Sequence, residues 1–135
     1  MDGSARQDAE FTVLIVEDED SIRDSLTELF DVGSVRVTAA ADTAAALDAL
    51  RTEVFDVVVT DLRLAGKDHG GLQVMAAAAL LSPDAAVVAL TAWPEEQNRL
   101  AAGRLGAVEF LEKPVDLTTI ATIAARHGVP SALSV

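Results

Sequence analysis

Three short apolar runs limit what this chain can fold into. They span Phe11–Val16, Phe55–Thr60 and Ala85–Leu90, and each is rich in valine or alanine. Short, mainly apolar runs of this kind are typical of parallel strands buried on both faces, because neither side of such a strand meets water. Two weaker candidates, Val35–Ala39 and Val108–Leu111, each follow a helical stretch and a glycine. The sequence therefore predicts five strands.

The segments between these strands have helical spacing. Apolar positions share one face in the first two helices, namely Ile22, Leu26, Leu29 and Phe30, then Ala46, Leu47 and Leu50. The other helices are expected over Leu72–Leu81, Glu95–Ala102 and Leu117–Ala125. The expected N-caps are Ser21, Asp42 or Thr43, and Asp116. Strand and helix alternate five times, which predicts an α/β fold with a parallel sheet, helices on both faces and ligands at the carboxyl ends of the strands.

Charge and composition exclude several classes of function. Ten Lys and Arg stand against 22 Asp and Glu, and the net charge of −12 would repel nucleic acid and anionic membrane surfaces. With no cysteine and two histidines, we expect neither thiol chemistry nor a metal site built from histidines. The first ten residues do not resemble a signal peptide and no apolar run is long enough to span a bilayer, so we expect a cytoplasmic protein.

Acidic residues follow the first predicted strand directly, as Glu17, Asp18, Glu19 and Asp20. Carboxylates held this close repel one another unless protons or a cation are bound, and their hard oxygen ligands suit Mg²⁺. The alternative is a solvated acidic turn in which Asp20 or Ser21 caps the next helix. The acidic run alone does not decide between a metal site and such a turn.

The other strand ends add a carboxylate, a hydroxyl and a cation. Asp61 follows the third strand, and because Leu62–Gly71 is predicted to be a loop, Asp61 is not explained as a helix cap. Thr91 ends the fourth strand. Lys113, one of only two lysines in the chain, follows the fifth strand and can reach an acidic site at the same edge. Its alternative role is that of a solvated lysine before Pro114.

Four fragments at these strand ends resemble the receiver domain of two-component response regulators. They are LIVEDED (14–20), VVVTDLRL (57–64), VVALTAW (87–93) and GAVEFLEKP (106–114), in that order along the chain. The resemblance covers about residues 11–127.

The resemblance also divides the chain and implies its fold. Residues 1–10 are then a flexible N-terminal segment, 11–127 the receiver domain and 128–135 a C-terminal tail. The implied fold is a flavodoxin-like, doubly wound, five-stranded parallel sheet in the strand order 2-1-3-4-5, with five helices.

A metal site and a phosphoacceptor are implied by the same resemblance. Glu17, Asp18, Asp61 and the backbone carbonyl of Arg63 would bind Mg²⁺, with Mn²⁺ as an alternative. Asp61 would accept the phosphoryl group. The chemistry agrees, because a carboxylate attacks phosphorus only when the negative charge on both groups is neutralised.

A signalling switch, rather than an enzyme, is the function that the resemblance implies. Thr91 would bond one phosphoryl oxygen, Lys113 would pair with another, and Phe110 would turn inward as Thr91 moves. The surface of the fourth helix, fifth strand and fifth helix would then change. Implied partners are a sensor histidine kinase or histidine phosphotransfer protein, and a downstream protein or fused effector domain. The chain would be a monomer or a phosphorylation-dependent dimer.

Two departures and three alternatives remain open. The loop Ala65–Gly71 lacks the usual proline and is longer than in the family by about two residues. Trp93 is expected to cover the site and to slow or redirect attack by water. An FMN carrier would need a loop rich in Ser, Thr and Gly where the four acids stand. A haloacid-dehalogenase-type phosphatase, which also uses an Asp nucleophile after a strand, would need a second acid where Arg63 stands. The stronger rival is a pseudo-receiver that binds proteins without being phosphorylated.

Overall fold

A computed structural model describes residues 9–64 and 70–134 of the chain. Most of the expected flexible segment 1–10 and of the expected loop extension Ala65–Gly71, including His69, lies outside these residues.

Five parallel strands form one sheet in the order β2-β1-β3-β4-β5. Their bounds are β1 Phe11–Val16, β2 Val35–Ala40, β3 Val57–Asp61, β4 Ala86–Thr91 and β5 Ala107–Glu112. The five predicted strands and their order are therefore confirmed. β3 begins two residues later than predicted, and the amide of Phe55 donates to the hydroxyl of Ser82 (2.9 Å).

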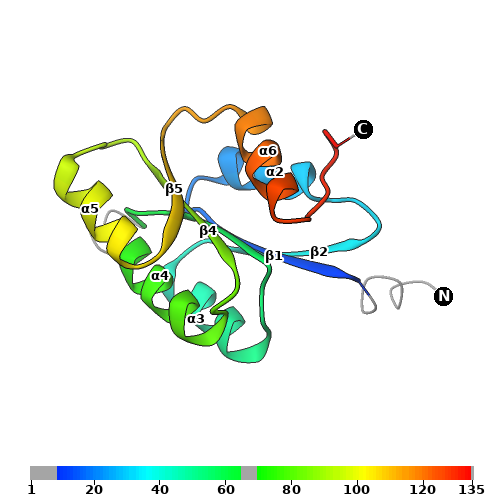
Figure 1. Cartoon of the computed structure of the whole chain (residues 1–135), viewed down its shortest axis with the longest axis horizontal. Coiled ribbons are helices and arrows are strands. Elements are labelled where there is room, and N and C mark those ends of the chain that lie inside the picture. The colour runs from blue at the N-terminus through cyan, green and yellow to red at the C-terminus, as the bar shows by residue number, and fades with distance from the viewer. Residues whose placement is uncertain (1–8, 65–69, 135) are drawn as a thin grey trace.

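Helices cover both faces of the sheet (Figure 1). The structure has α2 Asp20–Leu29, α3 Thr43–Thr52, α4 Gly70–Leu81, α5 Glu96–Arg104 and α6 Leu117–Arg126. Helices α2 and α6 pack in one core cluster on one face of the sheet, while α3, α4 and α5 pack in the other. In the two described ranges, no helix has the length and apolar character that crossing a membrane requires.

Two of the three predicted helix caps are confirmed. Asp42 accepts from the amide of Ala45 (2.8 Å), and Asp116 accepts from the amide of Thr118 (2.9 Å). The prediction of Ser21 as a cap is wrong, since α2 begins at Asp20 with Glu19 as its N-cap residue and no capping side chain. The carboxylate of Glu17 instead accepts from the amide of Glu19 (3.0 Å) and so shapes this turn.

The start of α4 corrects a second expectation. The predicted loop Leu62–Gly71 is too long, because Gly70 and Gly71 already belong to α4. A Cβ atom on Gly71 would lie 2.1 Å from the carbonyl oxygen of Asp61 and 2.4 Å from the Cα of Leu62. The amide of Gly71 donates to the carbonyl of Leu62 (2.9 Å). Glycine has low helix propensity, but here it lets α4 lie directly against the end of β3.

The chain beyond α6 packs back onto the domain. Val129 is buried in the core cluster that contains α2 and α6. The amide of Ala132 donates to the carbonyl of Leu29 at the end of α2 (2.7 Å).

Gly71→Ala is expected to lower the free energy of unfolding by about 1–3 kcal/mol, because backbone atoms occupy the place of the new methyl group. Gly103→Ala is the matched control, since Gly103 is inside α5 and a Cβ there meets nothing within 4 Å. The control should be more stable than the wild type by about 0.5–1 kcal/mol. Urea unfolding measures both, and equal effects of the two substitutions would contradict the close contact.

Candidate functional site

The predicted site residues converge at the carboxyl edge of the sheet. Glu17 directly follows β1, Asp61 ends β3, Thr91 ends β4 and Lys113 directly follows β5. Because the strands are parallel, their last residues lie along one edge, with Asp61 beside Leu90 in the sheet register.

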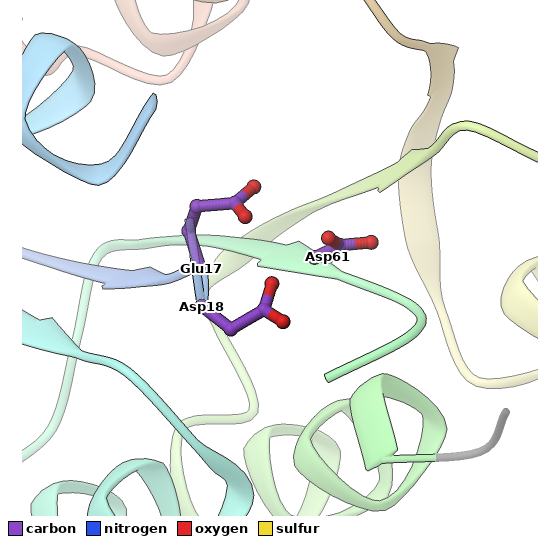
Figure 2. A group of neighbouring side chains, drawn as sticks. All are labelled: Glu17, Asp18 and Asp61. Atoms are coloured by element: carbon purple, nitrogen blue, oxygen red, sulfur yellow. The ribbon is translucent and has the colours of Figure 1, made fainter. Parts of the chain in front are cut away.

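Three carboxylates meet at this edge, from Glu17, Asp18 and Asp61 (Figure 2). One oxygen atom from each lies within 4.8 Å of the others. Glu17 and Asp61 are buried, at 0% and 5% exposure, while Asp18 is exposed. A cluster of this kind repels itself and offers hard oxygen ligands on one open side, which fits a divalent cation such as Mg²⁺.

Lys113 faces two of these carboxylates. Its Nζ lies 2.7 Å from Glu17 Oε1 and 2.7 Å from Asp61 Oδ2. Glu17 Oε1 is buried and has no directed hydrogen bond besides this ion contact. The amide of Lys113 donates to the carbonyl of Thr91 (2.7 Å), and the peptide bond between Lys113 and Pro114 is cis. The ammonium of Lys113 therefore pairs with two of the three carboxylates of the cluster.

The pKa directions of Glu17 and Lys113 follow from burial and from the contacts that these groups make. Burial raises the pKa of Glu17 above its ordinary value, although Lys113 and the amide of Glu19 act against burial. Burial lowers the pKa of Lys113, but its contacts with Asp61 and Glu17 outweigh burial and raise it overall. Lys113 contacts two carboxylates, whereas the fully buried Glu17 shares the ammonium of Lys113 with Asp61.

Thr91 and Asp61 are each tied to the residue two positions further along. Thr91 is buried, and its Oγ1 accepts from the amide of Trp93 (2.9 Å). Asp61 Oδ1 accepts from the amide of Arg63 (3.2 Å). The guanidinium of Arg63 lies over the indole ring of Trp93, with 4.9 Å from Cζ to the ring centroid. Sequence reasoning missed this pairing, for which the shared two-residue spacing was the only signal.

Phe110 lies outside this cluster of side chains. It is within β5 beside Ala89, half-buried, and packs against the core cluster of α3, α4 and α5. Its role as a switch and the role of the Arg63 carbonyl as a metal ligand remain predictions.

Comparison with known proteins agrees with this geometry. Residues 13–125 match the family described as the response regulator receiver domain. The chain belongs to this family. It is 33% identical to the transcriptional regulatory protein FixJ of Bradyrhizobium diazoefficiens over 125 residues, which cover 90% of this chain and 60% of FixJ. It is 30% identical to the response regulator protein FleR of Pseudomonas aeruginosa over 117 residues, which cover 87% of this chain and 24% of FleR.

Solved structures share the fold of this receiver domain. The non-phosphorylated HemR receiver domain of Leptospira biflexa has a TM-score of 0.76 at 31% identity, covering 87% of this chain and 94% of that one. A response regulator of Burkholderia pseudomallei, solved with a phosphorylated aspartic acid, a calcium ion and citrate, has a TM-score of 0.75 at 27% identity. That match covers 86% of this chain and 66% of the other. The family places the chain in two-component signalling, rather than among FMN carriers or phosphatases.

The buried position of Glu17 in this receiver domain predicts a pH dependence in the absence of metal. Because its pKa is raised, the folded state keeps this proton to higher pH than the unfolded chain does, starting from an ordinary value of 4.5. Protonated Glu17 therefore stabilises the folded state below its ordinary pKa. This contribution to the free energy of unfolding is lost as pH rises through the pKa of Glu17 in the folded state. The Glu17→Gln variant has no titrating group at this position. Its free energy of unfolding relative to the wild type should therefore increase as pH rises through this range.

Urea unfolding in EDTA, from about pH 4 to pH 8, measures the difference. Glu28→Gln, at an exposed position of α2, is the matched control. A difference between Glu17→Gln and the wild type that stays constant, or falls as pH rises, would show that Glu17 is not destabilised by ionisation.

Proposed function

We propose that this receiver domain is a phosphorylation switch, in which Asp61 takes a phosphoryl group from a sensor histidine kinase or a histidine phosphotransfer protein. One observation carries the proposal: Asp61 is buried beside Glu17 and Asp18, with the ammonium of Lys113 2.7 Å from its carboxylate. A nucleophilic carboxylate needs such a neighbourhood to approach an anionic phosphoryl group.

Asp61 is held in position for this reaction. The amide of Arg63 bonds one oxygen of its carboxylate and the ammonium of Lys113 bonds the other. In the reaction, one Asp61 oxygen forms a bond to phosphorus while the bond from phosphorus to the donor imidazole breaks. The electron pair of that bond stays on the imidazole nitrogen, and the product on Asp61 is an acyl phosphate. Hydrolysis restores the carboxylate, so the modification is reversible.

The acidic cluster would hold Mg²⁺, with Mn²⁺ as an alternative. Its ligands would be Glu17, Asp18 and Asp61, together with the backbone carbonyl of Arg63. When bound, the ion neutralises charge on the phosphoryl oxygens. The spacing of the three carboxylates and the complete burial of Glu17 support a cation here. The calcium ion in the Burkholderia structure supports a divalent one.

Thr91 and Lys113 would pass the change to the surface. The buried hydroxyl of Thr91 would bond one phosphoryl oxygen and Lys113 another, while Phe110 turns inward. The responding surface comprises α5, β5 and α6. Helix α5 suits this role because Ala102 is the one buried residue among its nine, so few contacts hold it in place. Phosphorylation would then shift an equilibrium between two conformations.

The wider setting of the domain is also proposed. A receiver domain over residues 11–127, with a C-terminal tail from 128, would act in the cytoplasm on a downstream protein or a fused effector domain. It would be a monomer or a phosphorylation-dependent dimer. A pseudo-receiver that binds proteins without phosphorylation is the rival, and the retention of Asp61, Thr91 and Lys113 at the strand ends argues against it.

Wild-type protein incubated with Mg²⁺ and acetyl phosphate is expected to gain one phosphoryl group. Asp61→Asn should gain none, because an amide does not form the acyl phosphate. Asp48→Asn, on the exposed face of α3, is the matched control and should label as the wild type does. Intact-protein mass spectrometry measures the gain, and labelling of Asp61→Asn at the wild-type level would move the acceptor elsewhere.

Asp18→Ala should weaken Mg²⁺ binding by at least about tenfold, since loss of even an outer-shell partner commonly costs 10- to 100-fold. It should also nearly abolish labelling by acetyl phosphate. Asp48→Ala removes the same charge far from the sheet edge and should change neither property. Isothermal titration calorimetry measures the affinity. Equal weakening by both variants would mean that the net charge of the domain, and not a site, attracts the ion.

A further inference from the structure

We propose that Arg23 is a positioning residue for the metal site, because its guanidinium holds the backbone turn that carries Glu17 and Asp18. The inference rests on the proposed binding of a cation by these two acids and Asp61. The turn is short, since β1 ends directly before Glu17 and α2 begins two residues after Asp18. Arg23 lies near the start of α2, and its side chain reaches back to the turn.

The guanidinium of Arg23 contacts both the turn and the start of α2. Its Nη1 donates to the backbone carbonyl of Glu17 (3.0 Å) and, at a longer distance, to that of Asp18 (3.5 Å). Its Nη2 pairs with the carboxylate of Asp20 (2.5 Å). The carboxylates of Glu17 and Asp18 belong to the acidic cluster at the sheet edge. Arg23 therefore fixes the stretch of chain from which two of the three acids project.

Arg23 is more shielded than comparable arginines of this domain. Its side chain is 20% exposed, whereas Arg51 and Arg99, which also pair with an acid three residues before them, are 64% and 58% exposed. The helix that carries Arg23 is anchored by Leu26 and Leu29, which are buried in the core. The guanidinium thus acts on the turn from a fixed base.

The turn has few other means of keeping its shape. The N-cap residue of α2, Glu19, makes no capping bond with its side chain. The carboxylate of Glu17 accepts from the amide of Glu19 (3.0 Å), but it also contacts Lys113 and is a proposed metal ligand. When its oxygens turn to a cation, these bonds weaken. The bonds from Arg23 end on backbone carbonyls, so they persist and keep both acids in position.

The charge of Arg23 and its hydrogen bonds act on metal affinity in opposite directions. A positive charge beside the cluster repels a cation, so on charge alone the removal of Arg23 would tighten Mg²⁺ binding. Loss of a group that orients metal ligands instead weakens binding, commonly by about 10- to 100-fold. The pair with Asp20, whose side chain is 86% exposed, contributes little because solvent screens it. The sign of the change in affinity therefore separates positioning from electrostatics.

The test measures Mg²⁺ affinity by isothermal titration calorimetry in the wild type, Arg23→Ala and Arg23→Lys. Arg23→Ala should bind Mg²⁺ about tenfold more weakly than the wild type. Arg23→Lys keeps the charge but not the fork of donors, so its affinity should lie between those of the other two proteins. Arg51→Ala removes the same charge from an exposed pair on α3 and should bind as the wild type does. Urea unfolding checks that each variant is folded, and if Arg23→Ala is not, Arg23→Lys decides.

A second readout separates the metal site from the phosphoryl chemistry. With acetyl phosphate as donor, Arg23→Ala should need about tenfold more Mg²⁺ for half-maximal labelling. At saturating Mg²⁺ it should label at the wild-type rate, because other bonds hold Asp61, Thr91 and Lys113.

The positioning role would be overturned by wild-type or tighter Mg²⁺ binding in Arg23→Ala, or by wild-type binding in Arg23→Lys. A wild type that binds Mg²⁺ but gains no phosphoryl group would overturn the proposed phosphorylation, while the affinities would still decide the role of Arg23. A wild type that binds no Mg²⁺ would overturn the proposed metal site and this role with it.

Discussion

The contact between Lys113 and the two buried carboxylates of Glu17 and Asp61 is the interaction on which the site depends. Each distance is 2.7 Å, and both acids are almost completely shielded from water. A buried charge without a partner is costly, so removing either member of a buried ion pair destabilises the fold strongly. Burial nevertheless raises the pKa of Glu17, although the contact with Lys113 acts against it. The edge of the sheet thus brings three carboxylates together beside this ammonium, an arrangement that could hold a metal ion.

The rest of the fold holds Glu17, Asp61 and Lys113 in position. The central strands β1, β3 and β4 contain only apolar residues and threonine until their ends, so charge appears only where the strands leave the sheet. Parallel pairing then brings those ends together. Gly71 lets α4 press against the backbone of Asp61 and Leu62, which holds β3 from the side opposite the helices α2 and α6. Stability and site geometry therefore share the same contacts.

Much of this arrangement follows from local sequence signals. The apolar runs, the caps Asp42 and Asp116 and the residues at the strand ends were predictable, because each depends on a short stretch of chain. The start of α4 was not, since its two glycines favour a loop by propensity and a tertiary contact decides otherwise. The stack of Arg63 on Trp93 joins two strand ends 30 positions apart and has no local signature. Tertiary contacts explain each of these failures.

The same contact between Lys113 and the two carboxylates suggests how the proposed switch would begin. In the structure, Lys113 divides its ammonium between Glu17 and Asp61. A phosphoryl group on Asp61 would change that division, because its charged oxygens are stronger acceptors than the neutral carbonyl oxygen that Asp61 retains in the acyl phosphate. Lys113 would then turn toward the phosphoryl group. The hydrogen bond that its backbone amide donates to the Thr91 carbonyl (2.7 Å) would link this movement to the end of β4. Thr91 and Lys113 would then respond together, and the adjacent α5, in which Ala102 is the one buried residue, would follow them with little resistance.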